Sequence, residues 1–474
     1  MSGRRYSVQV TTAHPGDQAT PCVDLARRDL TLDLARVFCV LLVVLVHLLF
    51  VGVGPDGAGG IAIARPLEEQ PWFAAATWAG QIMPLFFVVG GFATLTALRS
   101  RRRRYADATA AARAFAQERV LRLARPAVAL FAVLATALLG ATALGIDAGL
   151  LDAVAVGIGS PLWFLCAYLI CQLLAPALVA LHERAPRSTL VALVAGAIAV
   201  DVVQFGTGIE LLGYLNLLFV WPLVQQFGFW YADGWFARRR WWQLLAIAAV
   251  CWASLVPLTV WGPYSDDMLT NLNPPTLPLV ALGLGQAAVL QLLKRPLDAL
   301  MRTRAARGVV VTIGSRLMTV YLWHLPIIVA LGGLGLLVPG AAPAPGGAVW
   351  WATRPLVYLL VLGIVLALSL LLGRLEATRP IGRPAALPAL AAAAVLTIVP
   401  TFLITAEGLD APLAVAAALG FGIALALMSA GQNPKSPPNS PPPNSIASKP
   451  PAASTEPAAS AESVAPASPE SAVS

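Results

Sequence analysis

Charged side chains are scarce in this sequence. Asp, Glu, Lys and Arg make up 12% of the 474 residues, whereas 58% are hydrophobic, and the mean hydropathy is +0.74. Soluble domains carry charge on roughly a quarter of their residues. The composition therefore excludes a soluble protein with a single core and indicates that lipid is the solvent for most of the apolar surface.

Residue patterns of metal and cofactor sites are also missing from the sequence. Of the five cysteines, Cys39, Cys166, Cys171 and Cys251 lie inside apolar runs without the spacing of a zinc site. The chain has no HExxH sequence and no glycine-rich phosphate loop. We therefore predict no metal site and no permanently bound cofactor.

The basic residues follow a topological pattern. The formal net charge is +8, but Lys and Arg lie in short clusters at every second connection between apolar runs, as the positive-inside rule expects of cytoplasmic loops. We predict a multi-pass protein of the plasma membrane, with both termini cytoplasmic and no nucleic-acid partner. The clusters are 27–28, 99–104, 184–187, 238–240, 294–307 and 374–383.

The apolar runs recur at roughly 20 residues, the length that crosses a hydrocarbon core of about 30 Å. They predict an all-α, polytopic transmembrane helical bundle of about twelve helices. The expected helices are 31–54, 73–98, 126–146, 161–181, 188–205, 214–235, 241–261, 277–293, 308–332, 354–373, 385–406 and 411–431.

Composition divides the chain into four parts. Residues 1–30 predict a flexible cytoplasmic segment, residues 31–375 a transmembrane domain, and residues 376–431 two additional transmembrane helices. From residue 432 to residue 474 the chain is rich in Pro, Ser and Ala, which predicts a disordered cytoplasmic tail. We find no internal repeat.

The first expected helix carries ionisable residues on one face. His47 follows Arg36 by eleven residues, which places both on the same side with an axial separation of about 16 Å; Asp33 shares that face. Ionisable groups inside a membrane helix are costly and often mark function. His47 could accept a proton from an attacking hydroxyl or become acylated itself. The alternative is that Arg36 is a topological anchor and His47 a packed helix contact.

An Arg, ten residues and a His on the first helix resemble the signature of the membrane acyltransferase family three. PLFFVVGGFAT at 84–94 is similar to the second helix of that family, the Arg119 and Arg122 pair to a family arginine pair, and SPLWFLCAYLI at 160–170 to a helix start. YLNLLFVWPLVQQFGFWYADG, GPYSDDMLTNLNPPT and SRLMTVYLWHLPII resemble an actinobacterial-type branch. The resemblance covers roughly residues 30–375 and implies a core of about ten helices, so that about two C-terminal helices are additions. It departs at Gln225, where the branch often has a histidine.

The resemblance implies an acyl-CoA donor, with acetyl-CoA favoured, and an acceptor hydroxyl on a glycan, a glycolipid or a small molecule. It implies that His47 is catalytic, that Arg36 is its essential partner, and that Arg119 and Arg122 contact the donor. Guanidinium groups bind phosphate bidentately, which suits the phosphates of CoA. The alternative is that Arg119 and Arg122 lie in a basic loop for topological reasons alone.

Four residues are weaker candidates for a substrate route. Tyr321 and His324 lie one turn apart in TVYLWHLP; His324 could line the acceptor route, or could satisfy carbonyls freed by Pro326. Asn273, in the NLNPP turn, could bind acceptor or only shape the turn. Asp33 belongs to the same set.

We therefore predict an integral membrane O-acyltransferase that modifies a cell-envelope glycan, glycolipid or secondary metabolite, with membrane lipid around it. The alternative is a multi-pass transporter or exporter without acyl-transfer chemistry, which would be expected to show repeated halves and broken helices. A catalytically inactive scaffold or sensor is a third interpretation.

Overall fold

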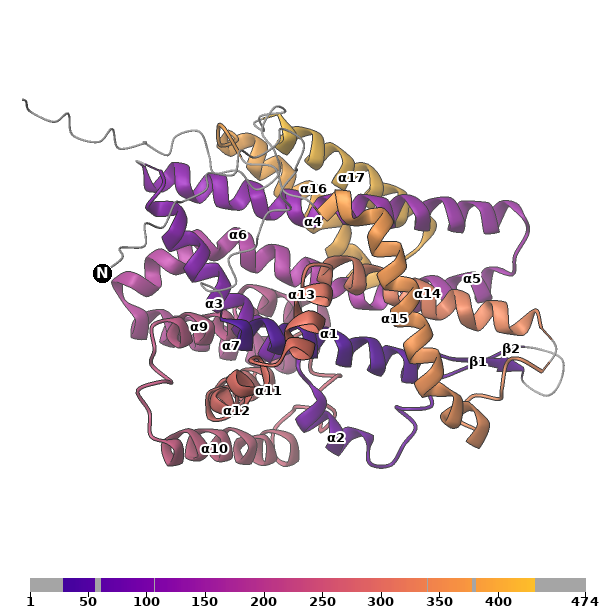
Figure 1. The fold of residues 1–474 in the computed structure, drawn as a ribbon, viewed down its shortest axis with the longest axis horizontal. Helices are drawn as coiled ribbons and strands as arrows, with labels where there is room; N and C mark the ends of the chain where they lie inside the picture. Colours follow the sequence, from indigo (N-terminus) through magenta and orange to yellow (C-terminus); the bar gives the residue numbers. More distant parts are fainter. Residues whose placement is uncertain (1–28, 56–60, 106, 339, 377–380, 431–474) are drawn as a thin grey trace, which may run out of the picture.

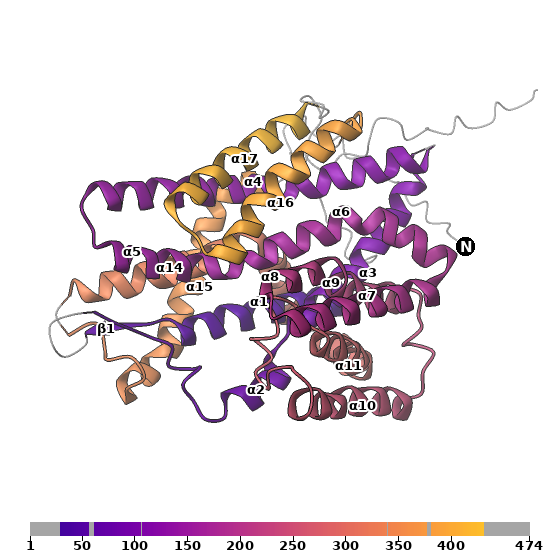
Figure 2. The same cartoon turned by 180° about the vertical axis from the view of Figure 1, so that it is seen from behind.

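The computed structural model describes residues 29–55, 61–105, 107–338, 340–376 and 381–430. The predicted tail, 432–474, and nearly all of the predicted N-terminal segment, 1–30, lie outside the described residues. Within the described chain, eleven helical segments are long and apolar enough to cross a membrane. The fold class is confirmed as a helical membrane bundle, shown from opposite sides in Figures 1 and 2.

The elements follow one another as α1 (Leu30–Phe50), β1 (Gly52–Pro55), β2 (Ile61–Ala64), α2 (Phe73–Gly80), α3 (Met83–Arg102), α4 (Ala108–Ala143), α5 (Ala148–Gly159), η2 (Ser160–Leu162), α6 (Trp163–Arg184), α7 (Pro186–Thr207), α8 (Glu210–Gly213), η3 (Tyr214–Leu218), α9 (Val220–Ala232), α10 (Trp241–Val260), α11 (Pro278–Leu292), α12 (Lys294–Leu300), α13 (Arg304–Gly314), α14 (Leu317–Leu336), α15 (Ala348–Glu376), α16 (Leu387–Glu407) and α17 (Ala411–Ser429).

The first helix ends earlier than its hydrophobic run. α1 stops at Phe50, and the expected end of that helix instead forms β1, which pairs with β2 in an antiparallel hairpin from Gly52 opposite Ala64 to Pro55 opposite Ile61. Glycine and proline are the weakest helix formers, and the run reads VGVGP here. Apolar character alone therefore overestimated the length of this helix.

The second predicted helix is broken. α2 ends at Gly80, Gln81 has an extended backbone, and α3 begins at Met83 with Pro84 in its first turn. Proline is tolerated there because the first N–H groups of a helix have no partner inside the helix. The break places polar groups of residues 81 and 82 inside the bundle.

The third predicted helix, expected at 126–146, begins much earlier and corresponds to α4. α4 starts at Ala108, and the Asp107 side chain caps it by accepting hydrogen bonds from the N–H groups of Thr109 and Ala110. Alanine-rich sequence with Glu, Arg and Leu favours a helix, so Arg119 and Arg122 lie on a helix and not in the expected loop.

The predicted helix at 277–293 is shorter than a membrane span. It corresponds to α11, which has 15 residues and packs against α3, α9 and α10. At 1.5 Å per residue, a helix of this length falls short of a core of about 30 Å. It is a buried element of the bundle.

α3 and α9 cross closely through two glycines. A Cβ atom on Gly91 would lie 2.2 Å from the Gln225 carbonyl oxygen, and one on Gly228 would lie 2.0 Å from the Val88 carbonyl oxygen. Small residues allow such backbone approach between membrane helices. This crossing sets the position of α3 beside α1.

The two C-terminal helices pack on the outside of α4 and α6, as Figure 1 shows. The Gln117 amide on α4 donates to the Met428 carbonyl at 2.7 Å, and its oxygen accepts from the Ala385 N–H at 2.9 Å. α16 and α17 are thus anchored to α4 by polar bonds as well as apolar packing.

The bundle has two distinct ends. At one, which we call the basic end, Arg99 on α3 bonds to Glu183 and Asp233 at the ends of α6 and α9, and Lys294 bonds to Asp29 before α1. At the other, the hairpin end, β1 and β2 lie beside the end of α14 and the start of α15 (Figure 1).

Candidate functional site

α1 brings His47 against α14. Val40, Val44 and Leu48 on one side of α1 are buried with Val320, Leu325 and Ile328 of α14. This packing holds His47 beside His324, which is fully buried, and the Nδ1 atom of His47 lies 2.9 Å from the Nε2 atom of His324. Two of the sequence candidates therefore meet.

The hydrogen bonds of His324 assign the tautomers of both rings. Its Nδ1 atom lies 2.7 Å from the Tyr321 carbonyl oxygen and 3.1 Å from the Val320 carbonyl oxygen. Carbonyl oxygens only accept, so this nitrogen carries the proton, and in a neutral ring Nε2 is then an acceptor. His47 donates its Nδ1 proton to that acceptor. The Nε2 atom of His47 is left with a free lone pair, which is the form required of a base or nucleophile.

Both rings are neutral for a physical reason. Among the described residues, no carboxylate lies within ion-pair distance of either imidazole, and an unpaired charge in apolar surroundings is costly. Pro326 has no N–H, so the carbonyl that it leaves without a donor is that of Leu322, four residues earlier. His324 instead bonds the carbonyls of Val320 and Tyr321. His324 is therefore not simply compensating for the proline.

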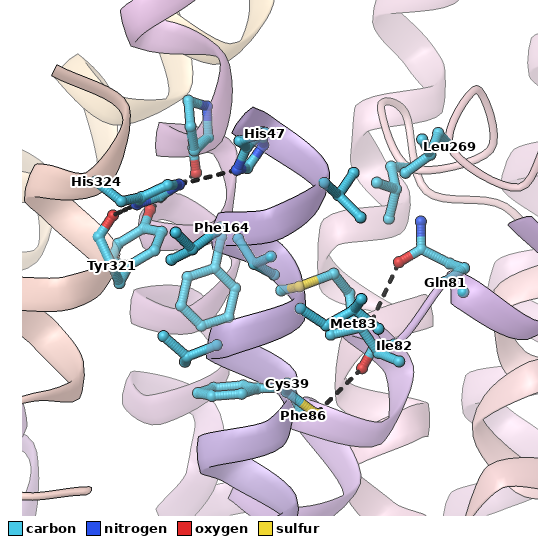
Figure 3. A pocket seen from close by; sticks show the side chains of 18 of the residues that line it. Cys39, His47, Gln81, Ile82, Met83, Phe86, Phe164, Leu269, Tyr321 and His324 are labelled. Atoms are coloured by element: carbon cyan, nitrogen blue, oxygen red, sulfur yellow. Dashed lines mark hydrogen bonds between the residues drawn. The ribbon is translucent and has the colours of Figure 1, made fainter. Parts of the chain in front are cut away.

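His47 and His324 line a cavity of about 110 Å³ between α1, α3, α6 and α14. Figure 3 shows His47 above the helix break, with Tyr321 and Phe164 on the α14 and α6 side. The Tyr321 hydroxyl donates to the Pro161 carbonyl at 2.8 Å. Since most of the lining is apolar, the cavity excludes water from the imidazole.

Gln81, at the break before α3, also lines this cavity. Its side-chain oxygen accepts from the Met83 N–H at 3.2 Å, which assigns the amide nitrogen as the opposite, donating end. Among the described residues, that nitrogen has only a long contact of 3.5 Å with the Met268 carbonyl. The sequence analysis missed Gln81; its signal was a single polar amide between Gly80 and Pro84 in an apolar run.

A second cavity, of about 440 Å³, opens at the basic end. It is lined by Asp33, Arg36 and Arg122, and Arg36 forms an ion pair with Asp33 at 3.3 Å. Leu317 lines both this cavity and the histidine cavity. The two cavities are therefore neighbours along α1.

The two arginines predicted to contact the acyl donor lie in different surroundings. Arg122 lines the basic-end cavity, whereas Arg119 does not. The Arg119 guanidinium lies over the Phe115 ring, 4.7 Å from its centroid, and its Nε atom has no hydrogen-bond partner among the described residues. Asn273 likewise stands outside both linings, although Leu269 and Leu272 of the same loop line the histidine cavity.

A third histidine, His182, joins a polar network at the basic end. Sequence reasoning overlooked His182, although Gln226 and Asp233 belong to the polar face expected on the helix at 214–235, where they could line a cavity or bridge helices. The two ring nitrogens of His182 lie 2.9 Å from the Gln226 side-chain oxygen and 3.0 Å from the Asp233 carboxylate. Arg99 bonds to the same carboxylate at 2.6 Å. This network joins the ends of α3, α6 and α9 and lines neither of the two cavities above. The only sequence signal of His182 was its place at the end of an apolar run.

No group of three or more His, Cys, Asp or Glu side chains within the described ranges could hold a metal ion. The four described cysteines are free and buried. Cys39 lines the histidine cavity, where its thiol lies 3.8 Å from the Ile82 carbonyl oxygen. The histidine cavity thus offers imidazole, amide, thiol and phenol groups, and the basic-end cavity offers guanidinium and carboxylate groups.

Comparison with known proteins identifies the family of the chain. No curated protein and no solved structure matches the chain. A family model described as an acyltransferase domain matches residues 29–374, well over half of the chain, and α16 and α17 lie beyond the match. The protein therefore belongs to this family, acyltransferase family three, and is a membrane acyltransferase.

Proposed function

We propose that the protein is an O-acyltransferase that moves an acyl group, with acetyl favoured, from a CoA thioester to a hydroxyl of a cell-envelope glycan, a glycolipid or a small molecule. The observation that carries this proposal is the pair of His47 and His324, which leaves the Nε2 lone pair of His47 free beside an apolar cavity.

The chemistry follows from that lone pair. His47 Nε2 takes the proton of the acceptor hydroxyl while the oxygen attacks the thioester carbonyl carbon. When the tetrahedral intermediate collapses, the C–S bond breaks and the thiolate takes the proton back from His47. In the alternative route, Nε2 attacks the thioester carbonyl first, the C–S bond breaks and the CoA thiolate leaves. The acceptor hydroxyl then attacks the acyl-imidazole, the bond from the acyl carbon to Nε2 breaks, and the hydroxyl proton passes to the thiolate. Both routes use the same nitrogen.

Gln81 supplies an electrophilic group in this scheme. Because the Met83 N–H holds its oxygen, the amide nitrogen is the donating end of Gln81, a residue that lines the same cavity as His47. A hydrogen-bond donor aimed at the developing oxyanion stabilises the transition state more than the ground state. We assign this role to the Gln81 amide.

The basic-end cavity suits the donor. Arg36 and Arg122 offer guanidinium groups for CoA phosphates, and Arg36 lies about 16 Å along α1 from His47. A donor that combines a charged head with a long, thin thioester arm matches two adjoining cavities of this kind. The proposal places the basic end, and with it both termini, in the cytoplasm of a cell bounded by this membrane. A donor contact for Arg119 stays a prediction of the family resemblance.

The test is turnover of acetyl-CoA by purified, detergent-solubilised protein, with candidate acceptors and with water alone. We expect thioester cleavage in the wild type and its loss in His47→Ala. Met83→Leu is the matched control, since Met83 lines the same cavity but has no group for proton transfer. A folded wild type that neither binds nor cleaves acyl-CoA would refute the proposal and favour the transporter interpretation.

A further inference from the structure

A third cavity, of about 170 Å³, lies at the hairpin end between α1, β1, α14 and α15. Its lining is apolar except for one charged side chain, Arg354 of α15. Leu48 and Val51 contribute to it, and both lie within one helical turn of His47. The cavity is distinct from the histidine cavity but is formed by the same stretch of α1.

Arg354 has no carboxylate within ion-pair distance among the described residues. Its Nε donates to the Trp350 carbonyl at 3.0 Å and one terminal nitrogen to the Thr353 hydroxyl at 3.3 Å. The guanidinium stacks on the Trp350 ring, 4.4 Å from its centroid. These bonds use two of the five N–H donors of arginine, which leaves three for a ligand.

The position of this arginine is unusual for its charge. The connections at the hairpin end are otherwise poor in basic residues, and Arg65, the other arginine there, pairs with Glu68 at 3.0 Å. Arg354 is half-buried, and a cation that lies partly in apolar surroundings without a counter-ion is costly. A bound anion would remove that cost, because a guanidinium and a phosphate form charge-assisted, bidentate hydrogen bonds.

The surroundings indicate how such an anion arrives. α15 is the least buried of the eleven spans, with 17% of its window buried in the described structure. Leu356, Leu359 and Leu360 are exposed along it, so lipid covers this helix. An anion that carries a hydrocarbon chain could place the chain along α15 and its head at Arg354.

We propose that this cavity binds the phosphate head of a membrane amphiphile, with Arg354 as the anion ligand and the apolar wall accepting the first part of the hydrocarbon chain. The site is independent of the acyl-transfer chemistry, and its test uses binding alone. The same phosphate chemistry could come from inorganic phosphate in solution, and the experiment separates the two sources.

The experiment measures binding of radiolabelled farnesyl phosphate to the purified full-length protein in dodecyl maltoside, by gel filtration at fixed micelle concentration. We expect saturable binding to the wild type, weakened tenfold or more in Arg354→Gln. Arg354→Lys should fall between the two, since lysine keeps the charge but not the fork. Arg65→Gln, which removes the other arginine of this end, should bind like the wild type.

Two further measurements distinguish a membrane amphiphile from free phosphate as the ligand and exclude misfolding as the cause of lost binding. Farnesol and inorganic phosphate should displace the probe poorly, because each supplies only half of the recognised chemistry. Gly335→Leu should fill the cavity and exclude the probe while Arg354 stays unchanged. The fold should tolerate the larger side chain, because a Cβ at this position meets only the Ala342 side chain and backbone, 3.7 and 4.0 Å away. Absence of binding to the wild type, unchanged binding in Arg354→Gln or Gly335→Leu, or displacement by inorganic phosphate as strong as by unlabelled farnesyl phosphate would each overturn the proposal.

Discussion

The Nδ1 atom of His47 donates to the Nε2 atom of His324 across 2.9 Å, although the two residues are 277 positions apart in the chain. The backbone carbonyls of Tyr321 and Val320 fix the orientation and tautomer of His324. His324 in turn fixes His47, so its effect on the chemistry is indirect. It is a positioning residue for the imidazole that faces the cavity.

Replacement of His324 should therefore lower the rate without weakening donor binding. For His324→Ala we expect kcat to fall about 10²-fold or more, the range typical of a misaligned general base, with the donor KM little changed. Steady-state acyl transfer measures both constants. Tyr321→Phe, which removes a hydroxyl bonded to Pro161 but leaves the His324 acceptors in place, is the control. Full activity in the alanine variant would contradict the positioning role.

Gln81 should act on kcat in the same way but for another reason. Gln81→Leu keeps the approximate volume and removes the amide donor, and loss of one oxyanion donor lowers kcat about 10²- to 10³-fold. The donor KM should stay near that of the wild type. Gln286→Leu removes a neighbouring amide that bonds the Gln81 backbone carbonyl at 2.6 Å, and it serves as the comparison. If Gln81→Leu and Gln286→Leu lost the same activity, the loss would come from a disturbed helix break and not from removal of the Gln81 amide N–H.

Arg36 should govern affinity for the donor. Arg36→Lys keeps the charge but loses the bidentate fork, so we expect the acyl-CoA KM to rise about tenfold with kcat nearly unchanged. Asp33→Asn should lower KM, because it removes the carboxylate that pairs with Arg36 at 3.3 Å. Arg307→Lys changes an exposed arginine outside this cavity and should have no effect. Unaltered donor affinity in Arg36→Lys would exclude the phosphate contact.

The Asp233 network should make stability depend on acid pH. Burial raises the pKa of the Asp233 carboxyl, but the hydrogen bonds from Arg99 and then His182 outweigh it and hold the pKa below its ordinary value. The stabilisation is thus complete above the unfolded value of about 3.9 and is lost as pH falls through the lowered native value. We expect the Tm of the wild type to drop as the pH is lowered below about 4, and to drop less in Asp233→Asn. Parallel profiles for the two proteins would show that another carboxyl is responsible.

The proposed orientation can be checked by labelling intact cells. A cysteine introduced at the exposed Asp266, in the loop between α10 and α11, should react with a membrane-impermeant maleimide, whereas one at the exposed Arg103 should not. The native cysteines of the described chain are buried and give a low background. The reverse pattern would invert the bundle and place the basic end outside.

Much of the architecture followed from local sequence. Hydrophobic run length and scarcity of charge predicted a polytopic helical bundle, because the thickness of the bilayer and the need to satisfy backbone hydrogen bonds act on each segment separately. The relation of Arg36 to His47 was also local, since both lie on α1 and the helical rise sets their separation. The same local reasoning misjudged α1 at its VGVGP end and α4 at its alanine-rich start, where turn chemistry and propensity outweighed hydropathy.

Tertiary structure decided the contacts on which the chemistry depends. His324 was a sequence candidate, but its bond to His47 exists only because α14 packs beside α1. The histidine cavity around Gln81 is formed by helices that are distant in the chain. The same is true of the basic-end cavity, which includes Arg122 but not Arg119. His182 and Asp233 likewise meet from different helices. Periodicity specifies which face of a helix is apolar; the packing partners of that face, and therefore the proton acceptor of His47, arise from the fit of the whole bundle.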